Sequence, residues 1–261
     1  MITAASNSRI KRLVQLNQKS KLRRTEDVFL AEGVKMFLEA PRKQLQEVYV
    51  SESFLEKCSC REYLEEVGYE VVSDSVFSKI SDTCTPQGIL CVLKQFHYNI
   101  EEMLRDKAPL FLLLENIQDP GNLGTMLRTG EGAGVSGIIM SRDTVDLYNP
   151  KVIRSTMGSI YRVPFYYADD FAAAVHQVQQ AGISVYAAHL RGKNSYACQD
   201  YTKGTAFLIG NEGNGLREET AELADCYIRI PMEGKVESLN AAVASSILMY
   251  EAHRQRAMIE K

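Results

Sequence analysis

The chain has 261 residues, of which 45% are hydrophobic and 24% are charged. This length and balance describe an ordinary globular protein with one large domain or two modest ones. No apolar run approaches the roughly 20 residues of a membrane helix, and no signal peptide is recognisable, so we expect a cytoplasmic protein without a membrane partner. The six cysteines follow no repeating frame, and Cys58-x-Cys60 has the wrong spacing for a zinc knuckle. We therefore expect reduced thiols and no metal.

The net charge of −3 is unevenly distributed along the chain. Seven basic residues and no acidic residue precede Glu26, which leaves the remainder strongly acidic. Because phosphate binding depends on local charge, this basic arm is a candidate contact for phosphates. A solvated helix face, or less readily an organelle transit peptide, would explain the same pattern.

Helical and strand patterns alternate over the first 93 residues. Helices are predicted at 10–16, 33–40, 62–67 and 75–80, and strands at 28–31, 48–50, 69–72 and 89–93. These elements describe a small α/β domain over residues 1–95. The polar segment 96–108, with a weak helical patch at 100–104, is the predicted linker.

The alternation resumes in a second domain over residues 109–261. Strands are predicted at 110–114, 137–140, 162–165, 184–188, 206–209 and 227–230, and helices at 122–133, 150–157, 170–181 and from Ser238 onward. This pattern implies a mostly parallel sheet with helices on both faces. Ligands of such sheets bind beyond the carboxyl ends of the strands, so the loops there are the candidate sites.

The first of three unusual loops begins at Asn116 and runs into a predicted helix that contains Asn122 and Arg128. Glycines at 130, 132 and 134 would each cost about 1 kcal/mol in a helix relative to alanine. Close approach of a ligand or a second subunit would justify them. Helix capping by Asn122 and pairing of Arg128 with Glu131 are the ordinary explanations of those two residues.

The second loop, Gly210-Asn211-Glu212-Gly213-Asn214-Gly215-Leu216, directly follows a strand. It lacks the Lys-Ser/Thr of a P-loop and the spacing of a dinucleotide fingerprint. Glu212 favours a ligand that carries hydroxyls, amines or positive charge over a bare phosphate. A turn with left-handed Asn and Gly residues is the alternative.

The third loop follows the strand that Pro231 ends, and Ser238 and Asn240 are predicted to open the last helix there. Side-chain oxygens and free backbone N–H groups converge at such a helix start. A helix cap accounts for this pair when it is taken alone. Small residues in the next two turns suit close packing of the helix against other chain segments or a second subunit.

Together the three segments resemble the motifs of the SpoU/TrmH-type RNA ribose 2′-O-methyltransferases, of the SPOUT class. The matching stretches are Asn122-Leu123-Gly124-x-x-x-Arg128-Thr129-Gly130, Ile209-Gly210-Asn211-Glu212-Gly213-x-Gly215-Leu216 and Ile230-Pro231-Met232-x-Gly234-x-x-x-Ser238-Leu239-Asn240. They stand in the family's order. Residues 7–11, 29–33 and 85–88 are more loosely similar to the small substrate-binding domain, of the ribosomal-protein L30e type, that many members carry.

The resemblance implies a trefoil-knotted C-terminal domain that binds S-adenosylmethionine, needs no metal, acts on RNA and forms a homodimer. The cofactor-binding residues would be Ile209, Gly210, Asn211, Gly213, Ile230, Met232, Gly234 and Leu239. The catalytic group would be Asn122, Arg128, Glu212, Ser238 and Asn240. The RNA-binding residues would be Arg9, Lys11, Arg12, Lys21, Arg23, Arg24, Lys151 and Arg154, although a solvated face explains the last two equally well.

The implied reaction can be checked against the residues. A ribose hydroxyl is a poor nucleophile at neutral pH, so some group must accept its proton or stabilise the developing oxyanion. Because arginine is effectively always protonated, we expect Arg128 to orient the target phosphate and stabilise negative charge, with Glu212 and Asn240 positioning Arg128 and the ribose. We predict ribose 2′-O-methylation, with ribosomal RNA favoured as substrate. The alternatives are a tRNA substrate, methylation of a base instead of a ribose, and a non-catalytic RNA-binding or ribosome-assembly protein on the same fold.

Overall fold

The computed structural model describes residues 1–259. Contacts within the chain group these residues into two compact units. The first unit combines Met1–Phe96 with Asp146–Tyr161, and the second contains the other described residues. The segment Asp146–Tyr161 lies in the middle of the predicted C-terminal domain, yet it packs in the first unit. The Tyr148 ring lies 4.8 Å from that of Phe29, and Asp146 forms an ion pair with the buried Arg23. The first unit is therefore built from two separate stretches of chain.

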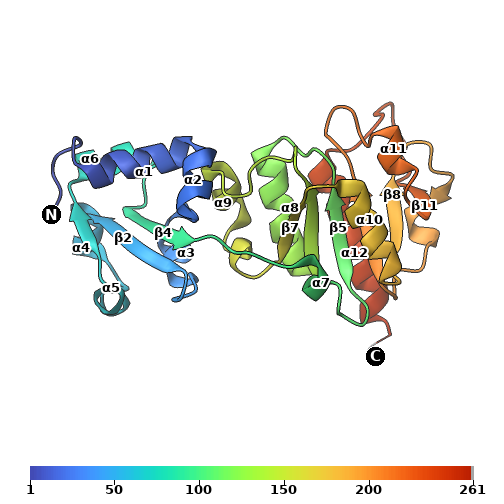
Figure 1. Cartoon of the computed structure of the whole chain (residues 1–261), viewed down its shortest axis with the longest axis horizontal. Coiled ribbons are helices and arrows are strands. Elements are labelled where there is room, and N and C mark those ends of the chain that lie inside the picture. The colour runs from blue at the N-terminus through green and yellow to red at the C-terminus, as the bar shows by residue number, and fades with distance from the viewer. Residues whose placement is uncertain (260–261) are drawn as a thin grey trace. The chain divides into compact units, whose positions relative to one another are not determined.

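The first unit contains a four-stranded sheet in the order β1-β4-β2-β3. Strand β4 is antiparallel to β1 and β2, whereas β2 and β3 are parallel. Helices α1 and α6 pack side by side on the sheet, where Ile10, Leu13 and Leu16 are buried (Figure 1). The elements are α1 (Ser8–Gln18), α2 (Ser20–Glu26), β1 (Val28–Glu32), α3 (Val34–Leu38), β2 (Leu45–Ser51), α4 (Glu52–Lys57), α5 (Arg61–Val67), β3 (Glu70–Val72), α6 (Asp74–Ile80), β4 (Ile89–Lys94), α9 (Pro150–Thr156) and η1 (Ser159–Tyr161).

The second unit is built on a seven-stranded sheet in the order β7-β6-β5-β10-β8-β11-β9. Every neighbouring pair is parallel. The predicted α/β class and parallel C-terminal sheet are confirmed. The elements are α7 (Ile100–Met103), β5 (Leu110–Leu114), α8 (Pro120–Ala133), β6 (Gly137–Ser141), β7 (Phe165–Ala168), α10 (Phe171–Gln180), β8 (Ser184–Ala188), β9 (Asn194–Ser195), η2 (Tyr196–Cys198), β10 (Thr205–Ile209), α11 (Glu218–Ala221), β11 (Cys226–Arg229) and α12 (Ala241–Ala257).

Helices cover both faces of this sheet, which explains its continuous apolar strands. Every residue of β5 and β10 is buried. Helix α10 covers one face, where Val175 and Val178 pack with Phe111 and Leu208 (Figure 1). Helix α12 packs on β5 and β10 from the opposite face and also against α8. The sheet ends are thereby held rigidly, and the loops beyond them are positioned by buried strands.

Three predicted boundaries are wrong for local physical reasons. The strand predicted at 162–165 starts only at Phe165, because Pro164 has no N–H for the ladder. Helix α8 starts at Pro120 and is capped by Asp119, which accepts the N–H of Asn122 at 2.7 Å. Helix α12 is capped by Asn240 rather than opened at Ser238. The short helices α2, α4 and α11 were not predicted, since fewer than two turns carry little periodic signal.

Neither a membrane-spanning helix nor a metal-ligand cluster is found in residues 1–259. No helix there is both long and apolar enough to cross a bilayer. No group of three or more His, Cys, Asp or Glu side chains there could hold a metal ion. The trefoil knot implied by the family motifs is not tested by strand order and stays a prediction.

Candidate active site

The candidate site lies where the carboxyl ends of β5, β10 and β11 meet at one edge of the sheet. Because β5 and β10 are parallel neighbours, the loops after Leu114 and Ile209 leave the sheet side by side. Strand β11 is separated from β10 only by β8. Three segments that are distant in sequence are thereby brought together, as the rule for ligand sites in open parallel sheets predicts.

A chain of hydrogen bonds joins one residue from each of the three loops. The Nδ2 of Asn240 donates to Oδ1 of Asn122 at 3.0 Å, and the Nδ2 of Asn122 donates to Oε1 of Glu212 at 2.9 Å. Asn240 also caps α12, because its Oδ1 accepts the N–H of Ala242 at 2.9 Å. Asp119 supplies the cap of α8, so the Asn122 side chain is available to make these bonds. Three of the predicted catalytic residues therefore form one connected polar unit.

Glu212 is the acceptor at the end of this chain. In addition to Asn122, the backbone N–H groups of Gln118 and Asp119 each donate to its carboxylate at 3.1 Å. Burial raises the pKa of Glu212, but the hydrogen bonds from Asn122 and the backbone outweigh burial and bring the pKa below its ordinary value of 4.5. Glu212 is consequently ionised at neutral pH and is a weak base, which suits a positioning anion better than a proton acceptor.

A cavity of about 310 Å³ opens beside this polar chain. Its walls come from the ends of β8, β10 and β11, from the loop after β10 and from the start of α12. Seven of the eight predicted cofactor residues line it, namely Ile209, Gly210, Asn211, Gly213, Ile230, Met232 and Leu239. A Cβ on Gly210 would lie 2.2 Å from the backbone carbon of Gly215, so only glycine lets the loop fold back at that point.

The cavity residues suit S-adenosylmethionine. The volume lies within the range of small-molecule sites. Ile209, Leu216 and Leu239 offer apolar walls for an adenine ring, and the carboxylates of Glu212 and Glu237 lie among polar residues that can accept from hydroxyl and ammonium groups. Two carboxylates against the single Arg229 leave the lining net negative, which favours a cofactor that carries a sulfonium charge over a nucleotide triphosphate.

The other predicted site residues occupy different positions. Ser238 lines the cavity and is exposed, two residues ahead of Asn240, the cap of α12. Gly234 lies in the same loop but does not line the cavity. Arg128 is exposed on α8, and its guanidinium has no hydrogen bond or ion pair within residues 1–259. It therefore lies outside the connected unit of Asn122, Glu212 and Asn240 and is free to meet a substrate.

The sequence reasoning missed the loop after β8, where Ala188, His189 and Leu190 line the cavity. The His189 ring stacks on Tyr227 with centroids 5.1 Å apart, and its Nδ1 accepts the N–H of Arg191 at 3.1 Å. Burial, and then the charge of Arg191, lower the pKa of His189 below its ordinary 6.5, so the ring is neutral at pH 7. Only the strand order could have indicated this loop, because β8 lies between β10 and β11 and its carboxyl end therefore also lies at the site.

The basic residues predicted to bind RNA differ in accessibility. Arg23 is only 3% exposed, and its guanidinium donates to the carbonyl of Leu16 and pairs with Asp146. The prediction that Arg23 contacts RNA is therefore dropped. Arg9 and Arg12 are held by acidic partners in the first unit. Lys11, Lys21, Arg24 and Lys151 are exposed without an ion pair in the described chain, whereas Arg154 pairs with Asp82.

Comparisons with known proteins agree with this architecture. Residues 109–250 match the SpoU rRNA methylase family, and residues 7–91 match the MRM3-like substrate-binding domain. The chain is 32% identical to the 23S rRNA (guanosine(2553)-2′-O)-methyltransferase RlmP of Bacillus subtilis, over 95% of this chain and 97% of the relative.

Two solved structures share the fold over nearly the full length. The S-adenosylmethionine-bound rRNA methyltransferase of Sinorhizobium meliloti has a TM-score of 0.83 and 30% identity, over 97% of each chain. The SpoU methyltransferase AviRb of Streptomyces viridochromogenes, also with bound cofactor, has a TM-score of 0.87 and 25% identity, over 96% of this chain and 98% of its own. The protein belongs to the SpoU rRNA methylase family.

Proposed function

We propose that the protein transfers the methyl group of S-adenosylmethionine to a ribose 2′-hydroxyl of ribosomal RNA. Family membership makes the chain an S-adenosylmethionine-dependent RNA methyltransferase. The observation that carries the specific assignment is the Asn240–Asn122–Glu212 chain beside the cavity. Ribosomal RNA is favoured over tRNA because RlmP and the Sinorhizobium protein are named for that substrate.

The cofactor would supply an activated methyl group, which needs no metal and only an oxygen nucleophile held in line. Glu212 fixes the Asn122 carboxamide through one hydrogen bond and the Gln118–Asp119 backbone through two. The loop that ends β5 is consequently locked to the loop that ends β10. This rigidity preorganises the edge on which the ribose must be placed.

The exposed Arg128 orients the target phosphate in this proposal. Its guanidinium stays protonated, so it stabilises negative charge as the 2′-oxygen loses its proton and does not itself accept that proton. The ionised Glu212 is also a poor acceptor, because its pKa lies below the ordinary range. Water or an RNA phosphate then takes the proton.

The first unit contributes the RNA-binding surface in this proposal. Lys11, Lys21 and Arg24 are exposed on the two N-terminal helices and make no ion pair within the described residues. Such cations can release counterions from an RNA backbone, whereas Arg23 cannot. Lys151 of α9 belongs to the same unit and is also exposed.

We also propose that the protein is a cytoplasmic homodimer. Val243 and Tyr250 of α12 are 48% and 49% exposed, although both are large apolar or aromatic side chains. Gly132 of α8 is exposed beside Tyr250, where a Cβ would lie 3.0 Å from the Tyr250 hydroxyl. An exposed apolar face of this kind, on two helices that pack together, suits a second copy of the chain. Sedimentation velocity would detect the dimer.

Replacement of Arg128 tests the proposed function. Arg128→Ala should abolish methyl transfer to ribosomal RNA while calorimetric binding of S-adenosylmethionine is retained, because Arg128 does not line the cavity. Arg105→Ala, an exposed arginine of the same unit, is the matched control and should turn over normally.

Nucleoside mass spectrometry of the product identifies the modified group. Ribose-methylated nucleosides in ribosomal RNA are expected. Unchanged turnover in Arg128→Ala contradicts the role of this arginine, and ribose methylation confined to tRNA, or methylation of a base, contradicts the proposed reaction.

A further inference from the structure

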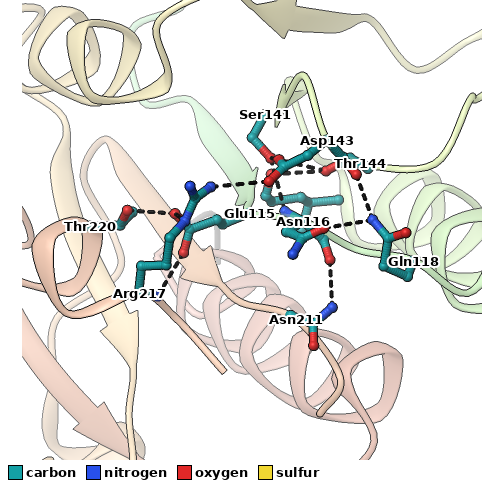
Figure 2. Close-up of polar contacts among 10 residues, drawn as sticks. Glu115, Asn116, Gln118, Ser141, Asp143, Thr144, Asn211, Arg217 and Thr220 are labelled. Carbon is teal, nitrogen blue, oxygen red and sulfur yellow. Dashed lines mark hydrogen bonds and ion pairs between the residues drawn. The ribbon is translucent and has the colours of Figure 1, made fainter. Parts of the chain in front are cut away.

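A buried carboxylate, Glu115, directly follows β5 and contacts Arg217 and Thr220 (Figure 2). It does not line the cavity of the candidate site. The Glu115 side chain is only 2% exposed. One oxygen accepts from Nε of Arg217 and from the Thr220 hydroxyl, and the other accepts the backbone N–H of Arg217 at 2.8 Å. A buried charge is tolerated only when it is fully paired in this way.

Arg217 marks the point where the loop after β10 ends. It is the residue before α11, and it follows Leu216, the last residue of the loop Gly210–Leu216. Glu115 therefore holds this end of the loop through both the backbone and the side chain of one residue. Asp143, after β6, accepts a further hydrogen bond from the Arg217 guanidinium at 3.2 Å (Figure 2).

The loop is also closed across its base. The N–H of Asn211 donates to the carbonyl of Gly215 at 3.0 Å, and the N–H of Gly215 donates back at 2.9 Å. Glu212 and Gly213, which line the cavity, lie between these two residues. A displacement of Arg217 must consequently be transmitted to the part of the loop that faces the ligand.

The same network holds the neighbouring loop after β5. Asn116 has a positive φ of 54°, a strained conformation for a residue with a side chain. Its carbonyl accepts from Nδ2 of Asn211 at 2.8 Å, and its N–H donates to the hydroxyl of Ser141 (Figure 2). Ser141 in turn donates to Asp143, which binds Arg217. The contacts that maintain Asn116 therefore belong to the network that includes Glu115.

We propose that Glu115 and Arg217 are a positioning pair, which sets the affinity for S-adenosylmethionine and the placement of Glu212 without touching the substrate or the cofactor. Neither residue lines the cavity. Buried ion pairs contribute little net stability, because desolvation offsets their attraction, and they are better suited to selecting one conformation. The inference rests on the proposed function, since cofactor binding and methyl transfer are its readouts.

Glu115→Gln tests the pair, because it keeps the shape of the side chain and removes its charge. We expect the Kd and the KM for S-adenosylmethionine to rise by about 10- to 100-fold, the range seen when a supporting partner behind the direct ligands of a metal site is removed. The KM for RNA should stay within about twofold of the wild-type value, as for a distant surface substitution. Glu222→Gln is the matched control, an exposed carboxylate at the end of α11, and should leave both constants unchanged.

Arg217→Lys keeps the positive charge but loses the Nε donor that binds Glu115. Because Arg217 is half-exposed, this variant should fold and tests the pair even if Glu115→Gln does not fold. A rise in the cofactor KM that is smaller than in Glu115→Gln is expected. The single variant Arg217→Gln completes a double-mutant cycle. The double variant Glu115→Gln/Arg217→Gln should be no worse than the poorer of its two single variants, because each of them removes the same interaction.

A purely structural role would lower the melting temperature by circular dichroism while the folded protein kept its cofactor Kd within about twofold, and that result would overturn the proposal. Additive losses in the double variant would also overturn it. The wild-type protein separates this question from the proposed function. If the wild type binds cofactor but methylates no ribose, the proposed function fails while the cofactor Kd of the variants still tests the pair.

Discussion

Replacement of Glu212 by glutamine probes the centre of the candidate site. Three N–H donors converge on the Glu212 carboxylate, from the backbone of Gln118 and Asp119 and from the Asn122 side chain. A glutamine at this position has one carbonyl oxygen and one amide group. Whichever way the amide is turned, at least one of the three donors faces another donor.

The size of the effect follows from this mismatch. A buried donor left unpaired costs about 1–3 kcal/mol. Because Glu212 is only partly buried, the free energy of unfolding should fall by no more than about 1 kcal/mol. The catalytic cost is larger, since Asn122 and the Gln118–Asp119 backbone are both released. A loss of about 1–3 kcal/mol in transition-state stabilisation corresponds to a reduction of about 5- to 150-fold in kcat/KM.

The assay is transfer of a radioactive methyl group from S-adenosylmethionine to ribosomal RNA, at several concentrations of each substrate. Glu222→Gln, an exposed carboxylate at the end of α11, is the control and should keep wild-type kinetics. Circular dichroism melting checks that the Glu212→Gln protein is folded. A folded Glu212→Gln protein with kcat/KM within about twofold of wild type would refute the idea that this carboxylate organises the site.

Two further predictions concern pH and salt. The pKa of Glu212 is lowered in the folded protein, so its contribution to loop stability and cofactor binding is fully present above pH 4.5 and is lost as the pH falls through the lowered pKa. Cofactor affinity measured by calorimetry should therefore not change through this group between pH 7 and 5, and a decline in that range caused by Glu212 would contradict the assignment. Replacement of Lys11, Lys21 and Arg24 by alanine should lower the slope of log K for RNA against log salt by about 0.7 per lost phosphate contact, and an unchanged slope in a filter-binding titration would remove these cations from the interface.

Motif spacing predicted the second unit well, because the second motif starts at the last residue of β10 and the third starts directly after β11, while the first lies in α8, the helix that follows β5. Strand β10 and the loop after it were expected from an apolar run followed by Gly210 and Asn211, and the structure has both. A continuous run of apolar residues predicts a strand that is buried on both faces, and such a run can be recognised in a short stretch of sequence. The loop after β8 has no such signal, since His189 and Leu190 gain their position only from the neighbouring strands.

Charge counting failed at Arg23 because it treats every basic residue of a run alike. Helices α1 and α2 leave Lys21 and Arg24 in solvent and turn Arg23 inward, onto the carbonyl of Leu16 and the carboxylate of Asp146. The latter partner is 123 residues away. A short basic helix carries no local feature that distinguishes a buried arginine from an exposed one, so only the tertiary fold separates them.

The same argument separates the two capping residues of the site. Asn122 and Asn240 were equally plausible helix caps from sequence, since both precede helical residues and both belong to a cap-forming residue type. Asp119 accepts the backbone N–H of Asn122 and frees the Asn122 carboxamide, whereas Asn240 caps α12 with its oxygen and reaches Asn122 with its nitrogen. A carboxamide can do both because it carries donor and acceptor on one group. Aspartate at position 240 could cap the helix but has no hydrogen to donate to Asn122, which is a physical reason for asparagine at this position.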